Sequence, residues 1–319
     1  MRTLPPNLFG IPFGLAGLAA AWHYAGVRDL APTAVGDALA LLGAVAWATI
    51  TVAYARSLRR PAALAEDLRH PIAGPFLSLV LIAPLVLVVT GVVPHAPDLG
   101  RALVDVLAVA IVVLGGWYTG QWIYAPIQPA QLHPGYFLPT VAGGLLAAAG
   151  AASVGQQRFA EVLLGYGLIC WLILGSIILG RLLVGPPLPT PLLPTLAIEV
   201  APAAVATQAY LAVRGEAIDP LVAVFAGYGL LMVLAQVRLL PVFGRLGFAP
   251  SFWAFTFSWA AVVTAGLHWL AILEPAGWRA WSYVLLGAVT LLIGAIAWRT
   301  AVAAARGQLL PAPAPPVAA

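Results

Sequence analysis

Glu199 is the side chain best placed to do chemistry, because it lies inside a long apolar stretch of the chain, three residues before Pro202. A carboxylate in such surroundings is costly unless it carries a proton or pairs with a cation. Arg238 and Arg181 are expected near the same end of their own apolar stretches, so either could be its partner. The sequence leaves two roles open for Glu199, a structural ion pair and a protonatable group.

Other reactive residue types are few and scattered. Cys170 is the only cysteine and lies in the middle of an apolar run, so we expect neither a disulfide framework nor a thiolate metal site. His23 and His268 lie near the ends of apolar runs, and no pair of histidines has metal-ligand spacing. No serine, histidine and aspartate set suggests a nucleophile. The sequence predicts no enzyme, no metal and no cofactor.

Composition indicates an integral membrane protein. Of 319 residues, 62% are hydrophobic and only 8% are charged, and the mean hydropathy is +0.98. Soluble domains carry about 25% charged residues. The net charge of +4 is spread over the chain without a basic stripe, so nucleic acid is not an expected partner. We expect the bilayer to be the main surrounding of the chain.

Ten apolar segments are long enough to cross a bilayer as helices. They predict an all-α fold of one domain over residues 1–300, followed by a Pro/Ala-rich cytoplasmic tail over 301–319 that we expect to be disordered. The predicted spans are Asn7–Tyr24, Thr33–Arg56, Ala73–Val93, Arg101–Trp122, Gly135–Val154, Phe159–Leu183, Leu193–Val213, Pro220–Leu239, Ser251–Leu270 and Ala280–Arg299.

The distribution of arginine predicts the orientation. An even number of spans puts both termini on one side, and basic residues favour the cytoplasmic side. Ten arginines fall on the side of the termini and five on the other, which favours cytoplasmic termini. The ten are Arg2, Arg56, Arg59, Arg60, Arg69, Arg181, Arg238, Arg245, Arg299 and Arg306.

A repeat of 62 to 64 residues runs along the chain. Pro12, Pro75, Pro139 and Pro202 follow one another at 63, 64 and 63 residues, and His70-Pro71 recurs 63 residues later. Fixed spacing is typical of a repeated supersecondary unit, here one helical hairpin. Each proline removes a backbone hydrogen bond, and the freed carbonyl needs protein or water around it. We therefore expect five hairpins around a central path, with odd-numbered spans inside.

The stretch 251–259 carries five aromatic residues in nine positions. On a helix, Phe257 shares a face with the small residues Ala260, Ala261 and Thr264. It stands near the place where the fifth repeat lacks its proline. Taken alone, this stretch is typical of ordinary aromatic packing in a membrane bundle.

Several strings resemble the tellurite-resistance and dicarboxylate transporter family, which includes bacterial TehA and the plant guard-cell slow anion channels. The resemblance is carried in order along the chain by residues 9–15 (FGIPFGL), 133–139 (HPGYFLP), 226–230 (AGYGL) and 253–257 (WAFTF). It implies ten helices in five hairpins around a pore, a homotrimer in a bacterial inner membrane, and passage of small anions. It also implies that Phe257 occludes the pore and that Gly10 faces it.

The expected pore lining is small and uncharged. A fixed cation would hold a small anion tightly, whereas conduction requires weak contacts at several positions. Two functions stay open: a gated anion channel, and a proton-coupled carrier or exporter of small anions such as a dicarboxylate, sulfite or a tellurite-like oxyanion. Glu199 favours the second if it titrates. The residues expected along the pore are Gly10, Pro12, Gly14, Pro139, Thr140, Gly143, Pro202, Ala261 and Thr264, with Phe257 as the gate.

Overall fold

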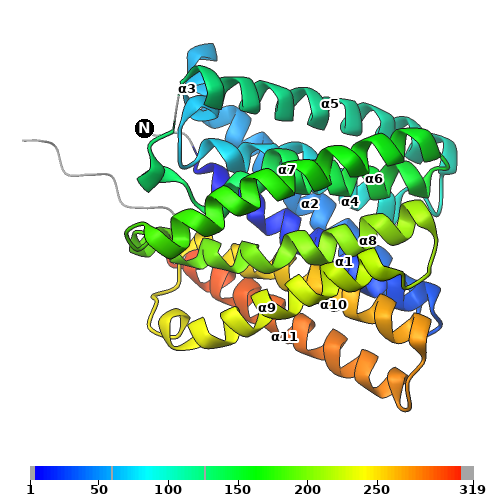
Figure 1. Ribbon diagram of the computed structural model, residues 1–319. Coiled ribbons are helices and arrows are strands. Elements are labelled where there is room, and N and C mark those ends of the chain that lie inside the picture. Colours follow the sequence, from blue (N-terminus) through cyan, green and yellow to red (C-terminus); the bar gives the residue numbers. More distant parts are fainter. Residues whose placement is uncertain (1–3, 59, 126, 310–319) are drawn as a thin grey trace, which may run out of the picture.

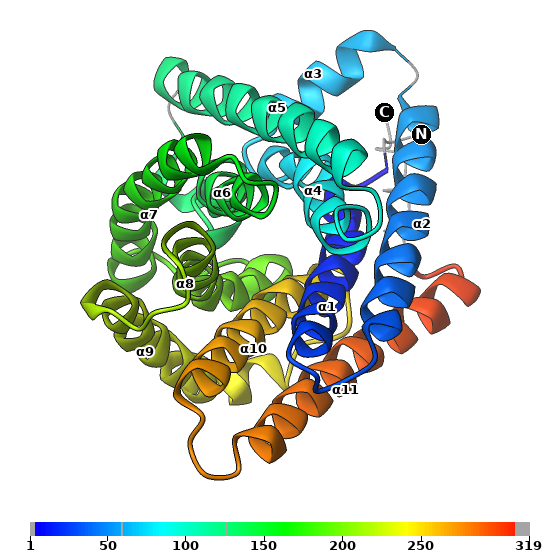
Figure 2. The same cartoon turned by 90° about the vertical axis from the view of Figure 1, so that its right-hand side faces the viewer.

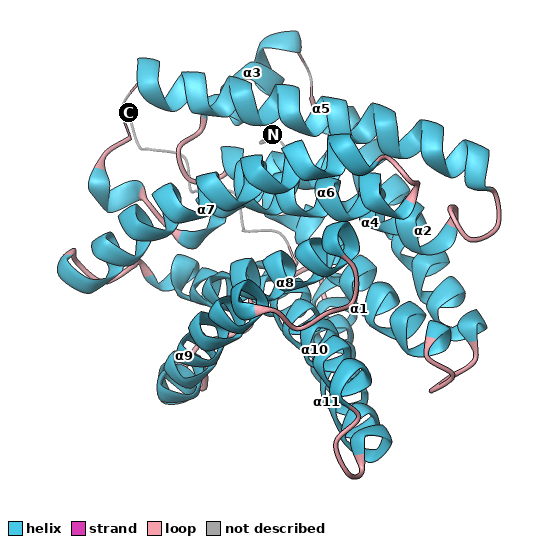
Figure 3. Ribbon diagram, turned by 45° about the vertical axis from the view of Figure 1, so that its right-hand side comes forward, coloured by secondary structure: helices cyan, strands magenta, loops and turns pink. Residues whose placement is uncertain are grey.

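The computed structural model describes residues 4–58, 60–125 and 127–309, and these form helices joined by short connections (Figure 1). Figure 3 shows no strand among them. Ten helical segments within the described ranges are long and apolar enough to cross a membrane, which confirms the predicted class. They are Pro6–Val27, Thr33–Ser57, Gly74–Gly91, Pro97–Tyr124, Pro134–Ser153, Gln157–Val184, Thr190–Arg214, Pro220–Phe243, Pro250–Leu273 and Trp278–Ala305.

Each odd-numbered span begins with an irregular turn and continues as a regular helix. The turns carry proline in their first positions, where it fixes the backbone and leaves hydrogen bonds of the following turn unmade. The pairs of turn and helix are η1 (Pro6–Phe9) with α1 (Gly10–Val27), η2 (Gly74–Ser78) with α4 (Leu79–Gly91), η4 (Pro134–Tyr136) and the π-helical η5 (Leu138–Ala142) with α6 (Gly143–Ser153), η6 (Thr190–Val200) with α8 (Ala201–Arg214), and η7 (Pro250–Trp253) with α10 (Ala254–Leu273).

The even-numbered spans are long, regular helices. Two short elements, α3 (Pro61–Arg69) and η3 (Pro129–Gln131), lie in connections and are not among the predicted elements. The last span continues to Ala305, so the helix extends into the predicted tail, whose residues 310–319 lie outside the described part of the chain. The long helices are α2 (Thr33–Ser57), α5 (Pro97–Tyr124), α7 (Gln157–Val184), α9 (Pro220–Phe243) and α11 (Trp278–Ala305).

The odd spans are inside and the even spans outside (Figure 2). In the most apolar part of the first span 72% of the residues are buried, against 17% in the second. The inner helices close a ring, because α1 contacts α4, α4 contacts α6, α6 contacts α8, α8 contacts α10 and α10 contacts α1. Each outer helix packs on the inner helix that precedes it and exposes valine and leucine on its far side, as lipid requires. That these pairs are repeated hairpins around a pore stays a prediction.

Small residues let the inner helices approach closely. A methyl group at Gly14 of α1 would overlap Thr256 of α10 and Trp253 of η7, and one at Gly17 would lie 2.9 Å from the ring of Phe257. Close approach through glycine is the usual packing device of membrane helices, which gain little from the hydrophobic effect inside lipid. The α1 and α10 pair is therefore held face to face along its length.

Candidate functional site

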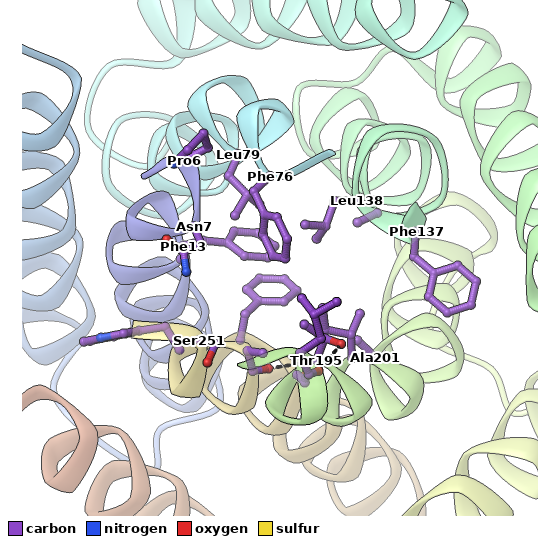
Figure 4. Close-up of a pocket in the computed structure, with 18 of the residues that line it drawn as sticks. Pro6, Asn7, Phe13, Phe76, Leu79, Phe137, Leu138, Thr195, Ala201 and Ser251 are labelled. Atoms are coloured by element: carbon purple, nitrogen blue, oxygen red, sulfur yellow. Dashed lines mark hydrogen bonds between the residues drawn. The ribbon is translucent and has the colours of Figure 1, made fainter. Parts of the chain in front are cut away.

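A cavity of about 280 Å³ lies where the first turns of the five inner helices converge (Figure 4). Every odd span contributes to its wall. Apolar side chains such as Phe76 and Leu138 make up most of the surface, and Asn7, Thr195 and Ser251 add polar groups. Among the described residues that line it, none carries a charge.

The N-terminal ends of the inner helices lie at this cavity. The first N–H groups of a helix have no partner inside the helix, and its N-terminal end carries a partial positive charge. Five inner spans turn their N-terminal segments toward the same space. Such an arrangement favours an anion over a cation without holding either tightly.

Phe257 and Phe13 close one side of the cavity. Both line it, and their rings stack with centroids 3.7 Å apart and an angle of 13° between the ring planes. Both side chains are buried, at 7% and 5% exposure. Gly17, one turn beyond Phe13, leaves room for the Phe257 ring because it has no side chain. Figure 4 shows Phe13 within the group of side chains that surround the space.

Phe255 has a different environment, although it is only two residues from Phe257. Its ring contacts Phe243 at 4.9 Å between centroids and Phe252 at 5.7 Å. It belongs to the packing between α10 and its outer neighbours and is absent from the cavity lining. Within one turn of α10, therefore, Phe255 packs against neighbouring helical segments and Phe257 lines the cavity.

Hydrogen bonds from the 133–139 string hold one wall of the cavity. His133, fully buried, has its Nε2 3.1 Å from the carbonyl oxygen of Ile72, while its Nδ1 accepts from the N–H of Gly135 at 3.1 Å. Tyr136 donates to the carbonyl of Pro71 at 2.5 Å. These contacts fix the turn that leads to Phe76, whose ring lines the cavity and stacks on His133.

His133 is suited to this role only in its neutral form. The ring lies in the connection just before the fifth span, where burial lowers its pKa to about 4. With Nδ1 accepting, the proton is on Nε2, which donates to Ile72. A second proton on Nδ1 would face the N–H of Gly135.

Three of the residues expected along the pore line the cavity: Gly10, Pro202 and Phe257. Gly14 faces α10, as described above. Gly143 faces the outer helix α5, since a methyl there would lie 2.7 Å from a methyl of Ile111. The others are buried outside the cavity lining; they are Pro12, Pro139, Thr140, Ala261 and Thr264.

Glu199 is buried, with 6% exposure, and lies outside the cavity lining. No basic side chain of the described residues forms an ion pair with it, and its Oε1 has no hydrogen-bond partner there. The Arg181 guanidinium instead donates to backbone carbonyls, at 2.8 Å for Pro186. Gln236 of α9 donates to Leu196, one turn before Glu199.

Phe13 lines the cavity but is not among the residues expected along the pore. It lies in the FGIPFGL string, four residues after Phe9, and both rings could face the interior. Only the contact between α1 and α10 shows which ring meets Phe257. The sequence could have indicated Phe13, because it is a large aromatic residue among the small residues of the first span, just as Phe257 is in the ninth span.

Comparison with known proteins places the chain in a family. A family model described as voltage-dependent anion channel matches residues 3–301, nearly the whole sequence. The chain belongs to the voltage-dependent anion channel family. This voltage-dependent anion channel homologue is also 26% identical over 268 residues to the tellurite resistance protein TehA homolog of Haemophilus influenzae, covering 82% of this chain and 80% of that protein.

Family membership supports a role in anion transport and favours a transporter or channel over an enzyme. The relative is named for tellurite resistance. The cavity agrees with this class, because it offers neutral groups and helix N-termini to a negative ion.

Proposed function

We propose that the protein is a gated channel for small anions and that the ions pass through the cavity. Phe257, stacked on Phe13, is the gate. The observation that carries this proposal is the position of the ring pair at the edge of an uncharged space lined by five helix N-terminal segments.

Weak attraction is the basis of selectivity in this proposal. Helix N-termini attract negative charge, and each contributes on the order of 0.3–1 kcal/mol to an exposed ion. The cavity lining holds no arginine or histidine among the described residues, so an anion meets no strong site from which it would have to escape. Several weak contacts are what conduction requires.

Closure follows from the rings themselves. Two stacked phenyl groups leave no polar atom for a hydrated ion and make the narrow section unfavourable for water. The Phe257 ring lies against Gly17, where a larger side chain would collide with the ring. The ring can therefore turn toward this small neighbour. Opening is a rotation of Phe257 or a shift of α10 relative to α1.

The surroundings of the channel complete the proposal. We infer a homotrimer in a bacterial inner membrane with both termini in the cytoplasm, each protomer with its own path. Support comes from the distribution of arginine and from the resemblance described above. Of the other proposed pore residues, Ala261 and Thr264 lie on the Phe257 face of α10 beyond the cavity, and the rest act through the packing that shapes the path.

A proton-coupled carrier is the second candidate. The observation that favours it is the buried Glu199, which has no ion pair within the described part of the chain. Glu199 lies outside the cavity lining, so protons and anions would have to be coupled through helix movement. Reversal potentials distinguish the candidates. A channel follows the anion gradient alone, whereas a coupled carrier shifts its reversal potential when only the proton gradient changes.

The gate is tested by replacing Phe257→Ala and recording anion current from purified protein in planar bilayers. We expect the current to rise more than tenfold, which corresponds to about 1.4 kcal/mol of barrier. Phe255→Ala is the matched control, because it removes the same ring from the same helix on the packing side. Equal currents from both variants, with both proteins folded, would contradict the gate.

A further inference from the structure

The faces of α1 and α10 that carry the stacked rings continue to the other end of both helices. Tyr24 lies eleven residues after Phe13, and His268 lies eleven residues after Phe257. Eleven residues are about three helical turns, so each later side chain points within roughly 20° of the earlier one, about 16 Å along the axis. The two helices lie side by side over this distance (Figure 2).

Tyr24 and His268 form a second ring pair. Their ring centroids are 3.9 Å apart, with an angle of 36° between the planes. Between the two pairs, the same faces carry only small residues, which are Gly17 and Ala20 on α1 and Ala261 and Thr264 on α10. A path that begins at the cavity and follows these faces therefore meets two aromatic constrictions with a section of small side chains between them.

Charged groups surround the second pair and not the first. Arg28, at the end of α1, forms an ion pair with Glu216 in the connection between α8 and α9. Its guanidinium carbon lies 5.2 Å from the centroid of the Tyr24 ring. His268 Nδ1 lies 3.9 Å from the other carboxylate oxygen of Glu216. The cluster therefore joins three inner helices, α1, α8 and α10, at the end opposite the cavity.

A polar atom of this cluster is buried without a partner. Nδ1 of His268 has no hydrogen bond to any part of the chain that the structure describes, and the Tyr24 hydroxyl has only the Arg28 side chain beside it. Buried polar groups of native proteins are normally satisfied, by protein or by water. An unsatisfied ring nitrogen beside an ion pair is what a position reached by water or by an ion would present.

We propose that Tyr24 and His268 form a second constriction of the same path, in series with the Phe13 and Phe257 pair. The inference rests on the proposed function, in which the path runs along these faces. The first constriction is apolar and excludes water, whereas the second is polar and carries the Arg28 and Glu216 charges. An ion leaving the section of small residues has to separate Tyr24 from His268.

Side-specific labelling tests the second constriction without measuring current. Thr264→Cys is introduced between the two ring pairs in a Cys170→Ala background, and a membrane-impermeant thiol reagent is applied to one side at a time. We expect little labelling from either side. Adding Phe257→Ala should admit the reagent from the cavity side, and adding His268→Ala should admit it from the opposite side.

His23→Ala is the matched control, because His23 precedes Tyr24 but packs against Gly36 of α2 on the outer side of α1. It should leave the labelling unchanged. Tyr24→Ala is the second variant in case His268→Ala does not fold. Folded His268→Ala and Tyr24→Ala proteins that stay unlabelled from the opposite side would overturn the inference, as would equal labelling in His23→Ala.

The current of double variants separates this inference from the proposed function. With two barriers in series, His268→Ala alone should change the anion current less than twofold. The current of the Phe257→Ala and His268→Ala double variant should be at least three times the current of Phe257→Ala alone. A double variant equal to Phe257→Ala would overturn the second constriction. If Phe257→Ala carries no current while far-side labelling still depends on His268, the gate fails and the second constriction stands.

Discussion

Acidification should destabilise the protein through His133, because the folded structure holds this ring in its neutral form. The pKa falls from 6.5 to about 4 on burial. Between about pH 6.5 and pH 4, His133 is protonated in the unfolded chain but stays neutral in the folded chain. The stability contributed by neutral His133 is therefore complete above about pH 6.5 and is lost as the pH falls toward 4.

The size of this effect follows from the pKa. One pKa unit corresponds to 1.36 kcal/mol, so the full loss below pH 4 is about 3 kcal/mol, and the loss between pH 7 and pH 5 is about 2 kcal/mol. Denaturant unfolding in detergent micelles at several pH values measures it.

The comparison with His133→Gln isolates this histidine from the others. Glutamine does not titrate, so its unfolding free energy should fall about 2 kcal/mol less than that of the wild type between pH 7 and pH 5, whatever its stability at pH 7. Parallel slopes for the wild type and His133→Gln would refute the reasoning.

Two further predictions concern packing and burial. Gly14→Ala should destabilise the protein by about 1–3 kcal/mol, because the added methyl overlaps Thr256 and Trp253. Gly116→Ala, whose added methyl meets no neighbouring atom within 4 Å, should be neutral or stabilising. Thermal unfolding of both variants checks this, and equal midpoints would contradict it. Glu199→Gln should keep or raise stability, because a neutral amide of the same shape removes the cost of a buried acid that has no basic partner among the described residues. A large loss in thermal unfolding would indicate an ion pair.

The ten helices follow from the sequence because bilayer thickness fixes how long an apolar run must be. Their first turns follow less well. Proline at Pro6, Pro134 and Pro250 shows that the backbone is irregular there, but not that these turns converge on one cavity. That convergence depends on the ring of contacts among the inner helices, which no local pattern contains.

Side-chain directions were predictable only where the helix is regular. On α10 the 3.6-residue period holds from Ala254 onward, and Phe257 faces the cavity as expected for a face separate from that of Phe255. In the fifth span the π turn at Leu138–Ala142 changes the number of residues per turn. A helical wheel drawn through Pro139 therefore misplaces Gly143, which faces α5.

Partners across helices were the least predictable feature. Phe13 meets Phe257 because Gly14 and Gly17 let α1 approach α10 closely. The wheel shows that the glycines share a face but does not say which helix they meet. The same is true of Glu199. Of its two expected partners, Arg181 forms hydrogen bonds with backbone carbonyls instead, and Arg238 forms no ion pair with it within the described residues.

The central claim is that anions cross the cavity and pass Phe257, and charge placed on the cavity wall tests it most directly. Ser251→Cys, in a Phe257→Ala and Cys170→Ala protein, is modified in a bilayer with either a sulfonate or a trimethylammonium thiol reagent. If the cavity is on the path, the negative adduct lowers the anion current and the positive adduct lowers it less or raises it. Identical currents before and after both modifications, with labelling verified by mass spectrometry, would contradict the claim.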